Sequence, residues 1–124
     1  MSRFSLIMTM LLTAASAPPD PAGLWLRADG NAYVRIAPCG TEVCATNTWI
    51  KDPGTGEAVG DRLIMDLAPR TGNVLAGTAY DPKRGMTYAV TVTVGPAGLT
   101  TRGCLLFGLL CRSVTWSRVR TPAS

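Results

Sequence analysis

Residues 86–94 read MTYAVTVTV, and this stretch decides the fold class. From residue 87 onward, threonine or alanine alternates with large apolar side chains. Thr87, Ala89, Thr91 and Thr93 fall on one face, and Tyr88, Val90, Val92 and Val94 fall on the other. Successive side chains of a β-strand point to opposite faces, so a period of two is typical of a strand with one buried face and one hydrated face. We therefore expect a sheet that buries one of its faces.

Similar β-rich runs occur on both sides of this stretch, separated by turn segments rich in Gly, Pro, Asp and Asn. The expected strands are 23–27, 32–38, 44–50, 63–67, 74–80, 86–94, 99–103 and 113–119. The run at 63–67 is the most ambiguous, because Leu63, Ile64 and Met65 also fit one turn of helix. Short connections favour antiparallel pairing of sequential strands.

Eight sequential strands with one buried face can close into a barrel, and closure removes the strand edges that invite aggregation. We therefore predict an all-β fold, a small antiparallel up-and-down β-barrel of about eight strands that is stapled by disulfides. An open sandwich is the second architecture. A chain of 124 residues has room for one such domain, and we expect a monomer.

The first 17 residues have the three parts of a secretory signal peptide. Arg3 is their only charge, an apolar run covers 4–12, and small residues occupy 14–17. This run is shorter than the roughly 20 residues that a membrane-spanning helix needs. We expect cleavage after residue 17 or 16 and a periplasmic or secreted protein. The predicted segments are a signal peptide at 1–17, a proline-rich leader at 18–22, the barrel at 23–120 and a tail at 121–124.

The composition excludes several classes of function, because the chain has 12 Lys+Arg, 8 Asp+Glu and no His. Without histidine it lacks the commonest zinc ligand and the general base of Ser-His-Asp and Cys-His hydrolases. The arginines are scattered, so we predict no nucleic-acid binding. We also predict no catalytic residue, no metal and no cofactor. If the protein were an enzyme, its catalytic groups would have to come from Tyr33, Tyr88, Glu42 or Asp81. Asp81, however, is expected to cap a turn.

Four cysteines in an exported protein predict disulfides. Cys39 and Cys44 flank residues 40–43, and Cys104 and Cys111 flank residues 105–110, so each pair would join two adjacent strands. We predict the pairs Cys39–Cys44 and Cys104–Cys111, worth about 2 to 2.5 kcal/mol each. A four-thiolate zinc site or a redox pair would need closer, C-x-x-C spacing.

Residues 105–110 read LLFGLL, five large apolar side chains in a connection where polar turn residues are expected. In one interpretation the segment folds back and plugs a barrel mouth. In a second, the disulfide holds it outward against a lipid surface or a partner, and in a third it is a lid over a pocket. Leu105, Leu106 and Phe107 are the candidate contact residues.

Three arginines lie near the cysteine-bearing turns, and two tryptophans fall on expected strands. If Arg35, Arg102 and Arg112 converge, their guanidinium groups could bind a carboxylate or a phosphate. The alternative is that they are hydrated surface residues paired with Asp or Glu. Trp49 and Trp116 are expected to pack against the sheet rather than to stack on a ligand.

Several motifs resemble the bacterial exported family known as domain of unknown function 2147. They are RIAPCG at 35–40, Cys44 with WIK at 49–51, YDP at 80–82, RGC at 102–104, CRS at 111–113 and WSRV at 116–119. The resemblance implies a small lipocalin-like β-barrel in the cell envelope and no established activity. In lipocalin-like barrels a Gly-x-Trp opening meets a late arginine, which implies a structural contact of Trp25 with Arg118. Such a cation–π contact contributes about 0.5 to 2 kcal/mol.

The sequence favours a non-enzymatic binding module whose mouth, near the cysteine-bearing turns, holds a small apolar or amphipathic ligand. That function requires an apolar cavity, lined by Val34, Ile36, Val90 and Val92. The alternative is a cell-envelope interaction or accessory protein with a filled core, which contacts a partner protein or a membrane surface through residues 105–110.

Overall fold

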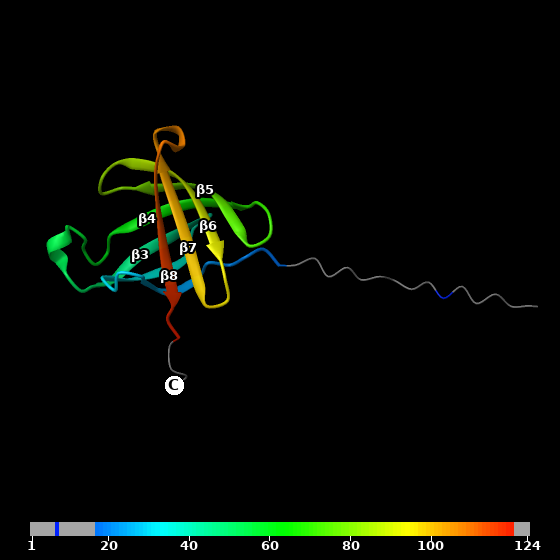
Figure 1. The fold of residues 1–124 in the computed structure, drawn as a ribbon, viewed down its shortest axis with the longest axis horizontal. Helices are drawn as coiled ribbons and strands as arrows, with labels where there is room; N and C mark the ends of the chain where they lie inside the picture. Colours follow the sequence, from blue (N-terminus) through cyan, green and yellow to red (C-terminus); the bar gives the residue numbers. More distant parts are fainter. Residues whose placement is uncertain (1–6, 8–16, 121–124) are drawn as a thin grey trace, which may run out of the picture.

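A computed structural model of the chain describes Ile7 and residues 17–120, and this part forms a closed β-barrel (Figure 1). The strands are β1 (Gly23–Arg27), β2 (Ala32–Cys39), β3 (Glu42–Ile50), β4 (Arg62–Pro69), β5 (Val74–Asp81), β6 (Met86–Val94), β7 (Gly98–Leu105) and β8 (Leu110–Arg118). Two single-turn 3-10 helices, η1 (Pro53–Thr55) and η2 (Leu106–Gly108), lie in connections. The predicted signal peptide, apart from Ile7 and Ala17, and the tail at 121–124 lie outside the described residues.

Each strand pairs antiparallel with the next one along the chain, and β8 pairs with β1 to close the barrel. The closing ladder places Trp25 opposite Arg118 and Arg27 opposite Trp116. The predicted eight-stranded up-and-down barrel is therefore confirmed, and the open sandwich is wrong. The ambiguous run at 63–67 lies within β4, where it pairs with both β3 and β5.

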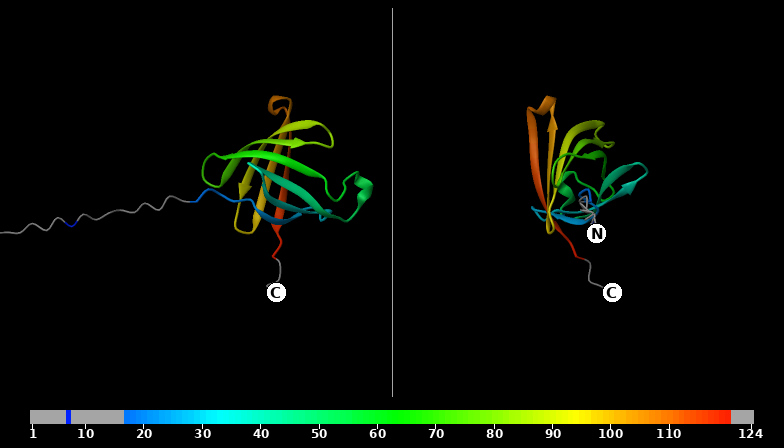
Figure 2. Two further views of the ribbon diagram at one scale, coloured as in Figure 1. Left: turned by 180° about the vertical axis from the view of Figure 1, so that it is seen from behind. Right: turned by 90° about the vertical axis from the view of Figure 1, so that its right-hand side faces the viewer.

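The β7–β8 hairpin is longer than the sequence predicted. Its ladder includes the pair Cys104 and Cys111 and continues to the pair Leu105 and Leu110. Both predicted disulfides are present, and Cys104–Cys111 joins residues that are already opposite each other in the ladder. The pairing therefore runs on to the last residues before the turn. Figures 1 and 2 show this hairpin projecting beyond the other strands.

The buried core follows the period of two that the sequence predicted. Val90 and Val92 face the interior with 8% and 1% of their surface exposed. The other buried apolar residues are Trp25, Ala32, Val34, Ile36, Met65, Leu75, Ala79 and Leu99. The core is therefore built from one face of the closed sheet, with buried apolar residues on six of its strands, β1, β2 and β4 to β7.

Trp25 fixes the end of the barrel where β1 begins and β8 ends, which we call the terminal end. Its side chain is fully buried, and its indole Nε1 donates a hydrogen bond of 2.9 Å to the carbonyl oxygen of Pro21. The Arg118 Cζ atom lies 4.3 Å from the centroid of the Trp25 ring, and Arg118 Nη1 donates to the Ala22 carbonyl at 3.3 Å. The contact implied by the lipocalin-like resemblance is present, and it ties the leader to the last strand.

Successive connections alternate between the two ends of the barrel, because every strand runs antiparallel to its neighbours. The Cys39–Cys44 turn lies at the terminal end. The connections 28–31, 51–61, 82–85 and 106–109 lie at the opposite end, which we call the hairpin end. The two disulfides are therefore at opposite ends, and the expectation of one mouth close to both cysteine-bearing turns is wrong.

Gly77 on β5 lies very close to the backbone of β4, its antiparallel neighbour in the sheet. A Cβ atom built on Gly77 would overlap the backbone oxygen of Asp66. Glycine is needed there because no side chain fits between the two backbones. Gly103 on β7 is also a strand glycine, but an added Cβ would meet no atom within 4 Å.

We predict that Gly77→Ala lowers the free energy of unfolding by about 3 kcal/mol, because the added methyl forces β4 and β5 apart. Urea titration followed by tryptophan fluorescence measures this. Gly103→Ala is the matched control and should change stability by less than about 1 kcal/mol. Equal losses in the two variants would contradict the close approach at Gly77.

Candidate functional site

A small apolar cavity of about 80 Å³ lies in the barrel interior. Val34, Ile36 and Val92 line it as expected, whereas Val90 does not. The remaining lining residues are Trp25, Ala45, Asn47, Met65, Leu99, Thr101 and Trp116. Pockets for small organic ligands usually have volumes of about 300–1,000 Å³. The side chains of this barrel therefore fill most of its interior.

The two tryptophans on strands β3 and β8 have different environments. Trp116 points into the barrel, and its Nε1 donates to the Thr101 hydroxyl at 3.0 Å. Trp49 lies on the outer surface, 41% exposed, with its ring centroid 5.1 Å from that of Tyr33. Both side chains are thus held by contacts within the sheet, as the sequence predicted.

A polar hollow of about 410 Å³ lies at the hairpin end, above the apolar interior. Its walls mix cationic and anionic side chains: Arg27, Asn47, Glu57, Asp61, Arg62, Leu63, Asp81, Arg84, Tyr88 and Arg112. The three carboxylates are all engaged, Glu57 with Arg27, Asp61 with Lys83 and Asp81 with Arg84. Most of the charge in this hollow is therefore neutralised by the protein itself.

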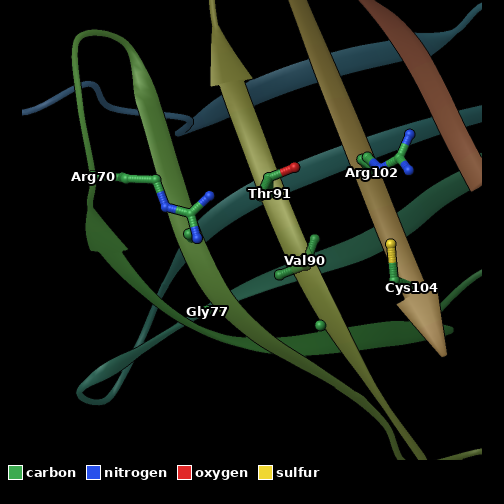
Figure 3. A pocket seen from close by; sticks show the side chains of 8 residues that line it. Arg70, Gly77, Val90, Thr91, Arg102 and Cys104 are labelled. Atoms are coloured by element: carbon green, nitrogen blue, oxygen red, sulfur yellow. The ribbon is translucent and has the colours of Figure 1, made fainter. Parts of the chain in front are cut away.

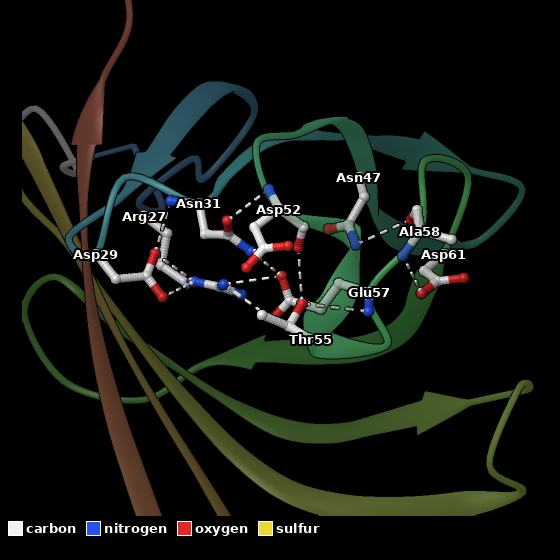
Figure 4. A network of polar contacts seen from close by, with 9 residues as sticks. All are labelled: Arg27, Asp29, Asn31, Asn47, Asp52, Thr55, Glu57, Ala58 and Asp61. Atoms are coloured by element: carbon white, nitrogen blue, oxygen red, sulfur yellow. Dashed lines mark hydrogen bonds and ion pairs between the residues drawn. The ribbon is translucent and has the colours of Figure 1, made fainter.

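A hydrogen-bond network at the same end joins the β1–β2 turn to the 51–61 connection (Figure 4). Arg27 donates to Asp29 and Glu57, each at 2.9 Å, and Asn31 donates to Glu57 at 3.1 Å. The Asn31 side chain also accepts from the Asp52 backbone N–H at 2.9 Å. The hydrogen bond from Arg27 is the main cause that lowers the pKa of both carboxyl groups, Asp29 and Glu57. This network holds the long connection against the barrel.

Asp81 caps the β5–β6 turn, as the sequence predicted. The residue is 5% exposed, and its carboxylate accepts from the backbone N–H groups of Lys83 at 3.0 Å and Arg84 at 3.3 Å. Arg84 Nη1 adds a charged hydrogen bond of 2.9 Å. Burial by itself raises the pKa of Asp81, but the hydrogen bonds from Arg84 and Lys83 outweigh it and lower the pKa.

Residues 105–110, which we call the hairpin tip, lie at the end of the projecting hairpin, and residues 106–110 are exposed to solvent. Phe107 is fully exposed, and Leu109, Leu106 and Leu110 are 82%, 62% and 59% exposed. The interpretation in which this segment plugs a barrel mouth is therefore wrong. Because the β7–β8 ladder continues to Leu105 and Leu110, only four residues remain to turn the chain, too few to fold back over the mouth.

The backbone of the hairpin tip is strained. Leu106 and Phe107 have φ angles of 52° and 57°, in the left-handed region. Side chains other than glycine adopt this region at a cost of roughly 1–2 kcal/mol per residue. The Cys104–Cys111 disulfide and the backbone hydrogen bond from Leu109 to Leu106, 3.1 Å long, close the turn around them. The turn thus holds Phe107 away from the barrel, and such strain concentrates at functional sites.

The structure does not bring Arg35, Arg102 and Arg112 together. Arg35 is an exposed residue of β2, opposite Leu24 and Thr46. Arg102 is an exposed residue of β7, and Arg112 lines both the polar hollow and a shallow depression with Leu105 and Leu110. Strand β1 lies between Arg35 on β2 and Arg112 on β8, and both β1 and β8 lie between Arg35 and Arg102 on β7.

The distribution of charge along the chain is a signal that the sequence reasoning missed. All eight acidic residues lie within 20–81. Residues 82–124 contain no acid and six cations: Lys83, Arg84, Arg102, Arg112, Arg118 and Arg120. The β7–β8 hairpin therefore carries only positive charge behind its apolar tip, and counting charges by segment would have shown this.

Ile7 and residues 17–120 contain no helix long and apolar enough to span a membrane. Within the same ranges, no group of three Cys, Asp or Glu side chains is placed to hold a metal ion.

We predict that the free energy of unfolding is nearly constant above about pH 5 and falls as the pH drops through 4. Asp29, Glu57, Asp61 and Asp81 all have lowered pKa values in the folded protein. The unfolded chain therefore takes up protons at a higher pH than the folded one, and acid favours unfolding. Urea titrations between pH 3 and pH 7 measure this dependence.

Asp81→Asn should lower stability at pH 7 and reduce its dependence on acid. The matched control is Asp66→Asn, which changes an exposed carboxylate on β4. It should leave the pH profile close to that of the unmodified protein. Identical profiles for all three proteins would show that Asp81 does not contribute to the acid dependence.

Comparison with known proteins gives a family but no described activity. The sequence model of a family described as "Uncharacterized protein conserved in bacteria (DUF2147)" matches residues 23–118, a range that includes all eight strands. Neither a curated protein nor a solved structure matches the chain.

Proposed function

We propose that this chain, which belongs to the DUF2147 family of uncharacterised bacterial proteins, attaches to anionic lipid bilayers in the cell envelope through its hairpin tip. The observation that carries the proposal is the exposure of Leu106, Phe107, Leu109 and Leu110 at the end of a projecting hairpin. Contiguous exposed apolar side chains of this kind mark sites of contact with proteins or membranes. The expected export would bring the tip to the envelope.

Apolar burial supplies the first part of the attraction. Transfer of a leucine or phenylalanine side chain out of water contributes about 1.5–3 kcal/mol when burial is complete. Phe107 is fully exposed, and its backbone conformation holds it at the far end of the hairpin. Insertion of the tip would therefore gain apolar contact without breaking any contact within the barrel.

Electrostatic attraction supplies the second part. Arg112 lines a depression together with Leu105 and Leu110, at the base of the tip. It follows Leu110 by two residues, which is about 7 Å along a strand. Interfacial segments enter a bilayer by roughly 5–10 Å, so Arg112 would lie among the headgroups. Each arginine near an anionic surface contributes about 1 kcal/mol.

The size of the tip favours a bilayer over a protein partner. A stable protein interface buries about 800 Å² on each side. The hairpin tip offers six residues on a narrow projection, whereas a bilayer needs no complementary shape. The interior cavity, at about 80 Å³, is small for an organic ligand. It therefore supports binding of an apolar ligand inside the barrel less than the exposed tip supports contact with a surface.

Phe107→Asp should weaken binding to vesicles of phosphatidylglycerol and phosphatidylcholine by about tenfold or more, because it removes apolar contact and adds a repelled charge. Co-sedimentation with the vesicles measures binding. The melting temperature should be unchanged, since the Phe107 side chain is fully exposed.

Val59→Asp is the matched control, because Val59 is an apolar residue 65% exposed in the 51–61 connection, away from the projecting hairpin. It should bind vesicles like the unmodified protein. The proposal is wrong if the unmodified protein does not bind, or if both variants lose binding equally.

Arg112→Gln should weaken binding to the same vesicles by about fivefold. Raising the salt concentration from 50 mM to 500 mM should reduce binding of the unmodified protein more than that of the variant, because salt screens exposed charges. Arg35→Gln, on the outer surface of β2, is the control with the same change of charge. Equal losses for the two arginine variants would point to net charge alone.

A further inference from the structure

A second hollow lies on the outer surface of the barrel, over β5, β6 and β7 (Figure 3). Its volume is about 420 Å³. The residues around it are Arg70, Ala76, Gly77, Ala89, Val90, Thr91, Arg102 and Cys104. We call this hollow the outer groove. It is separate from the polar hollow at the hairpin end, since the two share no lining residue.

The floor of the outer groove is made of small side chains from neighbouring strands. Ala76 on β5 is opposite Thr91 on β6, and Thr91 is opposite Arg102 on β7. Ala89 continues the same face of β6, two residues before Thr91. Because these side chains are short, a bound group can approach the sheet closely while long side chains reach it from the edges.

Two arginines flank this floor. Arg70 reaches over β5 from the β4–β5 turn, and Arg102 stands on β7 with its guanidinium directed toward β8 (Figure 3). The Thr91 hydroxyl lies on β6, between these two strands, so the exposed Arg102 side chain has to turn back across β7 to face Arg70. The backbone N–H of Arg70 donates to the Val74 carbonyl at 2.9 Å, which fixes the turn. In the described part of the chain neither guanidinium takes part in an ion pair, and no carboxylate lines the groove.

We propose that the outer groove binds a phosphate group between Arg70 and Arg102. A guanidinium offers a planar fork of N–H donors that matches the oxygens of carboxylate or phosphate. One fork satisfies a carboxylate. Two forks and the Thr91 hydroxyl suit a phosphate monoester, whose three terminal oxygens can accept from all of them. The absence of a lining carboxylate leaves the positive charge of the groove uncompensated.

The phosphate could belong to a soluble ester or to a lipid headgroup. The groove ends at Cys104, which is the residue before the hairpin tip. A lipid held by the tip would thus have its headgroup close to Arg102. The phosphate chemistry of the groove itself does not depend on bilayer binding, so soluble and membrane-bound probes test it separately.

The soluble test is a titration with glycerol 3-phosphate, followed by the arginine Nε–Hε signals in NMR spectra of the full chain. The signals of Arg70 and Arg102 should shift and saturate, while acetate at the same concentration should shift them much less. Arg70→Gln and Arg102→Gln should each weaken binding by about tenfold. Arg35→Gln keeps the same net charge as these variants and should bind like the unmodified protein.

The membrane test uses vesicles with phosphatidic acid, a monoester, and matched vesicles with phosphatidylglycerol, a diester. If the soluble ester saturates the signals, the groove binds phosphate and its ligand is a free phosphate ester. If the soluble ester does not bind, but the protein prefers phosphatidic acid and Arg70→Gln removes that preference, the groove binds phosphate and its ligand is a lipid. The proposal is overturned if neither result is obtained, if acetate shifts the signals as much as the phosphate ester does, or if Arg35→Gln weakens binding as much as Arg70→Gln and Arg102→Gln do.

Phe107→Asp should leave the soluble titration unchanged, which separates a failure of the groove from a failure of the tip.

Discussion

The pairing of β1 with β8 is the contact on which the rest of the structure depends. It turns eight sequential hairpin-linked strands into a closed sheet, so that one apolar face becomes a core and no strand edge remains open. Trp25 fills the terminal end, and Arg118 covers its ring from the last strand. The first and last strands are the most distant parts of the barrel in sequence, so their pairing closes the barrel only when all the strands between them are in place.

Closure also determines where surface features can arise. The terminal end is occupied by Trp25 and by the leader, whose Pro21 carbonyl accepts from the indole. At the other end β7 and β8 continue past their neighbours, locked by the Cys104–Cys111 disulfide. The interior is largely filled by its own side chains, with a cavity of only about 80 Å³. The larger hollows lie at the hairpin end and on the outer surface, and exposed apolar side chains lie on the hairpin tip, so both proposed binding surfaces are outside the interior.

Much of the fold could be predicted because its determinants are local in sequence. The alternation at 86–94 predicted the buried face of β6, and turn residues placed the strand boundaries within a few positions. The spacing of cysteines predicted both disulfides. Asp81 was predicted as a turn cap because it precedes Pro82 in a turn segment, and its hydrogen bonds go to residues only two and three positions later.

The candidate sites were less predictable, because they depend on which strands become neighbours and on how far each ladder extends. The composition of residues 105–110 identified an unusual segment, but only the pairing of Leu105 with Leu110 decided that it points outward. Arg102 was singled out beside Arg35 and Arg112, yet its partner across the outer groove is Arg70, from another turn. Sequence by itself determined the strands, the turns and the disulfides, since these need only nearby residues. The tertiary structure decided the exposed tip and the outer groove, because both require a fixed register between strands brought together by closure.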